Sequence, residues 1–205
     1  CHALYEVIER DSFFKWSHKS KDSRNANLIS LHSISNPSVI QLIDQIKKAS
    51  LNIKLWDISS ELKIPSFHCA IYNTDLSSPL SFFSGTGTHL NQEIAMTRAI
   101  TEAIQTRTSL ISGARDDIFN DYYYQQNLLL RQTIKMEFVD GLKRINDCPK
   151  IVYQNSFESN ISQLLNILSS NGHTLILWID RSKLEFNIPV IQVFIPSMQF
   201  SGARM

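Results

Sequence analysis

Two stretches of the chain combine carboxylates with arginine at spacings that suit one face of a helix. The first contains Glu6 and Glu9, three residues apart, with Arg10 directly after them. The second contains Glu102 and Gln105, again three apart, in a row that begins at Arg98. Because residues three and four apart lie on the same side of an α-helix, each stretch gathers acid, arginine and other polar groups on one face.

Carboxylates that are brought together repel one another unless a cation holds them. Hard oxygen ligands suit Mg²⁺, which commonly bridges protein carboxylates to phosphate oxygens. Arginines beside such a cluster can neutralise phosphate charge. The combination is typical of a nucleotide–Mg²⁺ site, and it would be built without a P-loop, since no Gly-x-x-x-x-Gly-Lys-Ser/Thr occurs. Taken alone, either row could instead be a solvated helix face with weak ion pairs.

The elements that must position these side chains can be read from local pattern. Gly85 and Gly87 predict a sharp backbone turn beside a bound group. Asn91 predicts the start of a helix over about 93–112. Leu4, Val7, Ile8 and later aromatic residues predict an opening helix over about 2–19.

The remaining elements recur in the same order in both parts of the chain. The predicted first set is a helix over 37–49 and strands over 52–58 and 67–72, and the second is a helix over 161–169 and strands over 174–180 and 190–195. We therefore expect an α/β (α+β) fold made by internal duplication, with halves at roughly 1–84 and 85–205. If a pseudo-twofold axis relates the halves, the two acidic helices can face each other across one nucleotide cleft.

Three segments together resemble the YcaO family over nearly the whole chain. They are Glu6-x-x-Glu9-Arg10-Asp11, the Gly85 to Arg107 stretch continued by Gly113 to Asp117, and Leu184-x-x-x-Ile188-Pro189-Val190…Ile195-Pro196. The resemblance implies a single YcaO-like domain over 1–205 that binds ATP and Mg²⁺. It also implies an enzyme that phosphorylates a backbone amide of a ribosomally made peptide, giving an azoline, a thioamide or an amidine.

The resemblance also implies roles for particular residues. The implied metal ligands are Glu6, Glu9, Glu93 and Glu102. The implied nucleotide-binding set comprises Glu6, Glu9, Arg10, Thr86, His89, Glu93, Glu102 and Gln105. Within that set, the implied catalytic residues are Arg10, Glu102 and Gln105.

The chain departs from the family pattern at its start. His2 stands where many members have a serine four residues before the first glutamate. Family domains begin well upstream, so the chain is expected to lack its amino end. The expected partners are a precursor peptide and a leader-peptide-binding or sulfur-delivery protein, and a homodimer is compatible with the sequence. The alternatives are a non-catalytic scaffold or peptide-binding subunit, and a different carboxylate-metal enzyme such as a hydrolase.

Composition narrows the classes of partner. The 205 residues carry a net charge of +1, with 19% charged and 43% hydrophobic residues, so bulk electrostatics do not argue for nucleic acid or a bilayer surface. No apolar run approaches the length that crosses a membrane. The three cysteines lack paired metal spacing and no secretory signal precedes them, which indicates reduced thiols in a cytoplasm. Tyr122 to Tyr124 are a hypothesis for peptide contact.

Overall fold

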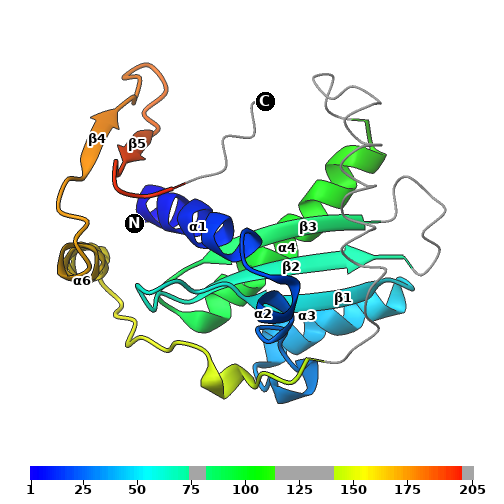
Figure 1. The fold of residues 1–205 in the computed structure, drawn as a ribbon. Coiled ribbons are helices and arrows are strands. Elements are labelled where there is room, and N and C mark those ends of the chain that lie inside the picture. The colour runs from blue at the N-terminus through cyan, green and yellow to red at the C-terminus, as the bar shows by residue number, and fades with distance from the viewer. Residues whose placement is uncertain (74–81, 114–140, 200–205) are drawn as a thin grey trace.

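The computed structural model describes residues 1–73, 82–113 and 141–199. Its fold is α/β, with one three-stranded antiparallel sheet in the order β1-β2-β3 and a separate two-stranded antiparallel sheet, β4-β5. Helices α3 and α4 cover one face of the larger sheet and α1 lies across the other, while α6, β4 and β5 form the part beside α1 (Figure 1).

The helices are α1 (His2–Ser17), α2 (Lys21–Asn25), α3 (Pro37–Lys48), α4 (Gln92–Ile111) and α6 (Phe157–Ser170), with 3₁₀ turns η1 (Leu31–Ser33) and η2 (Ile145–Asp147). The strands are β1 (Asn52–Asp57), β2 (Ser66–Tyr72), β3 (Phe82–Thr88), β4 (Leu177–Asp180) and β5 (Ile191–Phe194).

Side-chain caps explain where the longer helices begin. Asn36 accepts a hydrogen bond from the Val39 backbone N–H, and Pro37 occupies the first turn of α3. Asn91 accepts from two backbone N–H groups of the first turn of α4. These starts confirm the helices predicted from the same asparagines.

Strand β2 is buried along its whole length because both of its faces are covered. On one face Phe67, Cys69 and Ile71 pack in a core with residues of α3 and α4. On the other face His68 lies among aromatic rings of α1 and β1, with Trp16 and Trp56 centroids 5.0 and 5.6 Å away. The central strand therefore fixes the position of α1 relative to the sheet.

The sequence interpretation of Gly85 and Gly87 was wrong. Both lie inside β3, paired with Cys69 and Phe67 of β2, and neither has a positive φ. Their role is close packing: a Cβ on Gly85 would lie 2.3 Å from the Ala103 backbone nitrogen of α4. The missing side chains thus allow the backbones of β3 and α4 to touch.

The second part keeps the predicted order of elements with shifted bounds. Helix α6 begins at Phe157, four residues before the start predicted at 161. Strand β4 begins at Leu177, three residues after the start predicted at 174. The division between residues 84 and 85 falls inside β3, so the internal duplication stays a prediction. Tyr122 to Tyr124, the hypothesis for peptide contact, lie outside the described residues.

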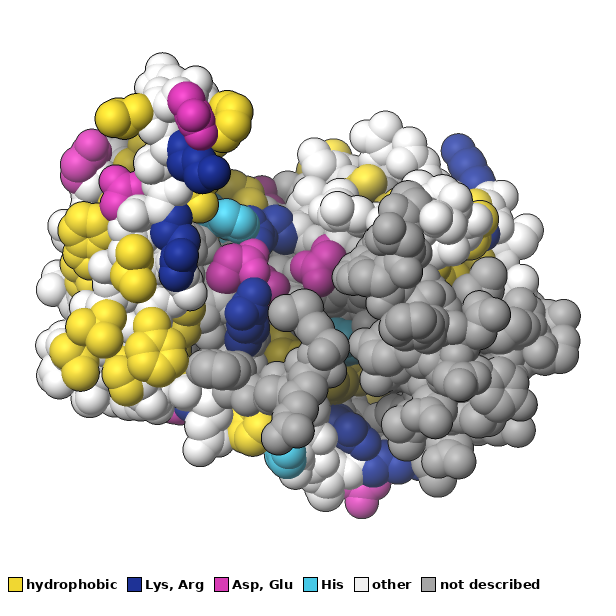
Figure 2. All heavy atoms as spheres, turned by 90° about the horizontal axis from the view of Figure 1, so that it is seen from above, with side chains coloured by type: hydrophobic (Ala, Val, Ile, Leu, Met, Phe, Trp, Pro, Cys, Tyr) yellow, Lys and Arg dark blue, Asp and Glu magenta, His cyan; other side chains and the backbone are white. Residues whose placement is uncertain are grey.

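Large apolar side chains are exposed on the smaller sheet. Trp178 of β4 is 66% exposed and Phe194 of β5 is 47% exposed. The space-filling view shows apolar side chains gathered on the same side of the molecule as α6, β4 and β5 (Figure 2). Within the described ranges, no helix combines the length and the apolar character needed to cross a bilayer.

Candidate functional site at the edge of the larger sheet

The edge strand β3 lies between the two acidic helices. Helix α1 packs on one side of it and α4 on the other. Because Gly85 and Gly87 have no side chains, the Cβ atoms of Glu102 and Arg98 come against the strand itself, 2.7 and 2.8 Å from the positions a glycine Cβ would take. Both side chains therefore leave α4 beside β3, at the edge that α1 also reaches.

Thr86 connects the two helices. Its hydroxyl donates a hydrogen bond of 2.9 Å to Glu9 Oε1 of α1. Its backbone N–H lies close enough to the Glu102 carboxylate to counteract the rise in the pKa of that acid. One strand residue thus lies beside carboxylates of both acidic helices, which the sequence had predicted to meet.

Glu9 is the most deeply placed acid of the site. It is 5% exposed, and its second oxygen, Oε2, is buried without a hydrogen-bond partner. Burial raises the pKa of Glu9 to about 7, and the nearby charges of Glu6 and Glu102 act in the same direction. An orphaned buried carboxylate oxygen is costly in isolation, and a bound cation would satisfy it.

Glu102 combines an exposed side chain with a partly shielded carboxylate. The residue is exposed as a whole, yet desolvation raises its pKa, with the Glu6 charge acting in the same direction. The two observations are compatible because a long side chain can remain accessible along its stem while its carboxylate approaches Thr86. Glu102 thus lies where the acidic group meets solvent.

Glu6 completes the acidic group, but it is already paired. Its Oε1 accepts a hydrogen bond of 3.0 Å from Arg98 Nη2 of α4. The same oxygen lies 3.6 Å from His2 Nε2. Arg98 is therefore the cation that balances these carboxylates.

The raised pKa of Glu9 predicts a pH dependence of stability. Between pH 4.5 and 7 the folded protein keeps a proton that the unfolded chain has released, so the free energy of unfolding falls as pH rises through this window. We expect a loss of up to about 3 kcal/mol attributable to this group. Thermal midpoints at pH 5, 6, 7 and 8, compared with Glu9→Gln, measure it. Parallel pH profiles of the two proteins would contradict the assignment.

The other predicted residues form two groups: some lie next to these acids, and others do not. His89 lies between the rings of Tyr5 and Tyr153, at 4.7 and 5.1 Å, and its Nδ1 accepts from the Asn91 backbone N–H. Gln105 is exposed about one turn beyond Glu102 on α4. Gln105 thus belongs to α4, and His89 lies in the link between β3 and α4.

Two predicted residues are not joined to this group. Arg10 is exposed, and it makes no hydrogen bond or ion pair with any other residue that the structure describes. Glu93 lines a hollow of about 310 Å³ with Asn36 and Ile145. Nine residues separate Glu93 from Glu102, which at about 100° per residue puts them on opposite faces of α4.

The acids do not by themselves form a ready-made metal cage. Among residues 1–73, 82–113 and 141–199, no group of three or more His, Cys, Asp or Glu side chains is arranged to hold a metal ion. Mg²⁺ commonly takes one or two protein carboxylates and fills its other positions with phosphate oxygens and water. Glu9 and Glu102 fit that requirement, because both are oxygen donors and one has an unused buried oxygen.

Charged groups gather between the two parts of the molecule. In the space-filling view acidic, basic and histidine side chains lie together near the middle of this face (Figure 2).

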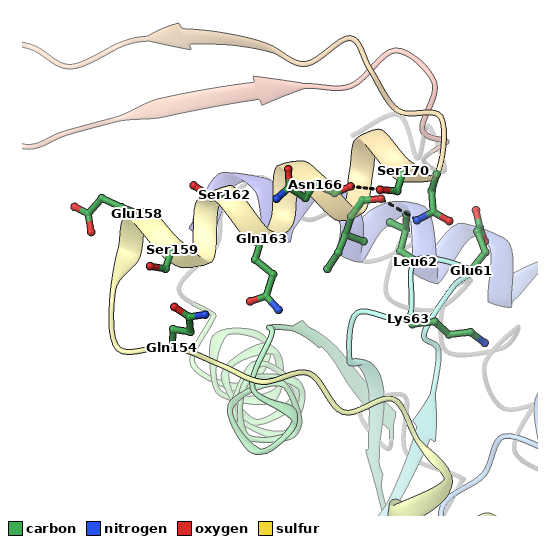
Figure 3. A pocket seen from close by; sticks show the side chains of 12 residues that line it. Glu61, Leu62, Lys63, Gln154, Glu158, Ser159, Ser162, Gln163, Asn166 and Ser170 are labelled. Carbon is green, nitrogen blue, oxygen red and sulfur yellow. Dashed lines mark hydrogen bonds between the residues drawn. The ribbon is translucent and has the colours of Figure 1, made fainter.

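A second hollow, of about 760 Å³, lies between α6 and residues 61–63, where Gln154 and Gln163 point toward each other (Figure 3). Its lining is mainly hydroxyl and amide groups and includes none of the predicted site residues, so it is separate from the candidate site.

Arg98 is the functional candidate that sequence reasoning left out of the predicted set. A signal for it existed, because it lies four residues before Glu102 in the same helical row. Its partner could not be predicted, since the contact with Glu6 depends on how α1 packs across β3.

Comparison with known proteins gives the site a family context. A curated protein of Methanothermobacter thermautotrophicus is 24% identical over 216 residues, covering 97% of this chain and 51% of its own length. The chain thus spans about half the length of that relative. A solved structure titled "Heterocyclase in complex with substrate and Cofactor" superimposes with a TM-score of 0.72 at 22% identity, covering 96% of this chain and 26% of its own.

A second solved structure has a similar fold. YcaO from Methanopyrus kandleri, bound with AMPPCP and Mg²⁺, superimposes with a TM-score of 0.71 at 16% identity, covering 95% of this chain and 50% of its own. At these identities the two superpositions show a shared fold. The family model described as "YcaO cyclodehydratase, ATP- and Mg²⁺-binding" matches residues 1–199. The chain therefore belongs to the YcaO family.

Proposed function

We propose that this chain is the nucleotide-binding part of an ATP- and Mg²⁺-dependent enzyme that phosphorylates a backbone amide of a ribosomally made peptide. The observation that carries the proposal is the Glu9–Thr86–Glu102 arrangement, in which two acidic helices meet at one strand and leave a buried carboxylate oxygen free. Two solved relatives of the same fold are titled as holding a substrate and cofactor, and AMPPCP with Mg²⁺, respectively.

In the proposed reaction the substrate amide oxygen forms a bond to the γ-phosphorus of ATP. The bond between that phosphorus and the bridging oxygen breaks, and ADP leaves. A thiol, hydroxyl or sulfide then adds to the activated carbon and loses its proton to solvent. The bond from that carbon to the phosphorylated oxygen breaks and phosphate leaves with the electron pair. Loss of the nitrogen proton gives an azoline, whereas addition of sulfide gives a thioamide that keeps its N–H. Mg²⁺, when bound, would neutralise charge on the phosphate oxygens.

Each side chain of the site has a task that matches its position. Glu9 and Glu102 would hold the cation, and Glu6 would join them once released from Arg98. Gln105 and Thr86 would orient the nucleotide, and His89 would border it. Arg10 is exposed on α1 and is proposed to approach the transferred phosphoryl group once substrate is bound.

The two buried cysteines, Cys69 and Cys148, do not suit the role of an internal nucleophile. Burial raises the pKa of the Cys148 thiol to about 12, and burial raises the pKa of Cys69 as well. A buried thiol that stays protonated is a poor nucleophile. The reacting thiol, hydroxyl or sulfide is therefore proposed to come from the peptide or from a sulfur-delivery partner.

A second candidate function is a non-catalytic scaffold or peptide-binding subunit of a modification complex. One observation favours it: in the part of the chain that the structure describes, the acids do not form a three-ligand metal group. The buried, unpartnered oxygen of Glu9 favours the catalytic function, because a scaffold gains nothing from a desolvated carboxylate.

Phosphate release separates the two candidates. The full-length protein is incubated with ATP, Mg²⁺ and the ribosomal peptide encoded beside its gene. We expect phosphate release that requires both Mg²⁺ and the peptide, together with loss of water from the peptide for an azoline or exchange of oxygen for sulfur for a thioamide. Peptide binding without any phosphate release would support the scaffold instead.

A further inference from the structure

Arg98 lies beside the acids that would bind a metal ion, and it pairs with one of them, Glu6. It leaves α4 beside Gly87, and its Nη2 donates to Glu6 Oε1 at 3.0 Å. Its Nη1 lies 3.0 Å from His2 Nδ1. The guanidinium therefore bridges the amino-terminal turn of α1 and the middle of α4, across the edge of β3.

The charge of Arg98 reaches the whole site. Burial raises the pKa of Glu9 and of Glu102, and the Arg98 charge lowers both by a smaller amount. Burial lowers the pKa of His89, and the Arg98 charge lowers it further. Its Nε is buried without a hydrogen-bond partner. The side chain thus neutralises the acids electrostatically while part of its hydrogen-bonding capacity stays unused.

Arg98 and a divalent cation compete for Glu6. Arg98 occupies Oε1 of Glu6, so a metal ion that took this oxygen would displace the guanidinium. Two cations held within a few ångströms also repel each other. A guanidinium also binds phosphate oxygens through two parallel N–H donors. The Arg98 side chain is 29% exposed, so part of it is in contact with solvent beside Glu6.

We infer that Arg98 is a placeholder cation. In the protein without ligands it pairs with Glu6. When a nucleotide binds together with a divalent cation, Arg98 leaves Glu6 and pairs with the phosphates of the nucleotide. This inference rests on the proposed function of the site. It assigns Arg98 as a positioning residue that keeps the acids together before loading and holds nucleotide afterwards. Its consequence is that removing Arg98 has opposite effects on bare metal and on metal–nucleotide binding.

The test measures two affinities in the full-length protein. Binding of Mn²⁺ alone is followed by electron paramagnetic resonance of the free ion, and binding of Mn²⁺ with AMPPCP by calorimetry. In Arg98→Gln we expect bare Mn²⁺ to bind about three- to tenfold more tightly, because its competitor is gone. We expect Mn²⁺–AMPPCP to bind about tenfold more weakly, because a charged phosphate contact is lost.

Two further variants make the result interpretable. Arg98→Lys keeps the charge, so bare Mn²⁺ should bind as in the wild type while Mn²⁺–AMPPCP binds at an intermediate level. Arg181→Gln on the β4–β5 hairpin, where Arg181 donates to Gln192 rather than to a carboxylate of the site, makes the same change in net charge and should alter neither affinity. Loss of both affinities in Arg98→Gln, or an unchanged affinity for bare Mn²⁺, would overturn the placeholder role. Failure of the wild type to bind Mn²⁺–AMPPCP would instead overturn the proposed function.

Discussion

Replacing Gly87 with valine is expected to lower the free energy of unfolding by more than about 3 kcal/mol. A Cβ at this position would lie 2.2 Å from the Ala95 carbonyl oxygen and 2.4 Å from the Ala99 nitrogen, both backbone atoms of α4. Overpacking against side chains costs about 1–3 kcal/mol, and backbone atoms yield less readily. A loss above about 3 kcal/mol would remove much of the stability of a typical domain, which is about 5–15 kcal/mol. Urea unfolding followed by circular dichroism measures the loss.

Ser84→Val is the matched control for this substitution. Ser84 belongs to the same strand, is only half-buried, and points to the face opposite α4, so a β-branched side chain should be tolerated there. We expect its urea midpoint to stay close to that of the wild type. A Gly87→Val protein that unfolds at the same urea concentration as Ser84→Val would show that β3 and α4 can separate without cost, and the site geometry would lose its basis.

The glycines show where local sequence reasoning reached its limit. Glycine is unfavourable in strands and suits turns, so Gly85 and Gly87 pointed away from a strand. What decided their conformation was the approach of α4, which needs a surface without side chains. That requirement is tertiary, and no window of the sequence around Gly85 contains it.

Some features of the candidate site could likewise be predicted from the sequence, and others could not. Helical spacing makes the polar rows of Glu6, Glu9 and Glu102 visible in the sequence, whereas their meeting was predicted only on the condition that a pseudo-twofold axis relates two halves. The placement of Glu93 on the far face of α4 also follows from helical spacing, and applying it would have separated Glu93 from Glu102. The contacts of Thr86 with Glu9 and of Arg98 with Glu6 join residues far apart in the chain, so only the packing of α1 across β3 reveals them.

Glu102→Ala is expected to reduce peptide-stimulated phosphate release by about 100-fold or more, since a preorganised charged group of the site is removed. Glu93→Ala is expected to stay within about threefold of the wild type, since a first-turn acid contributes mainly to helix stability. Both substitutions remove one carboxylate from the same helix, so a difference between them reflects position alone. Initial rates at saturating ATP and Mg²⁺ provide the comparison.

The pair distinguishes a shared site from a general effect of charge on α4. Glu102 approaches Thr86 on the side of α4 that faces α1, whereas Glu93 lines the hollow beside Asn36 and Ile145. If the two carboxylates acted through the overall field, their removal would change the rate by similar factors. Equal losses, or a larger loss in Glu93→Ala, would therefore move the catalytic centre away from the β3 edge. A large loss confined to Glu102→Ala would tie phosphoryl transfer to the strand that also holds Glu9.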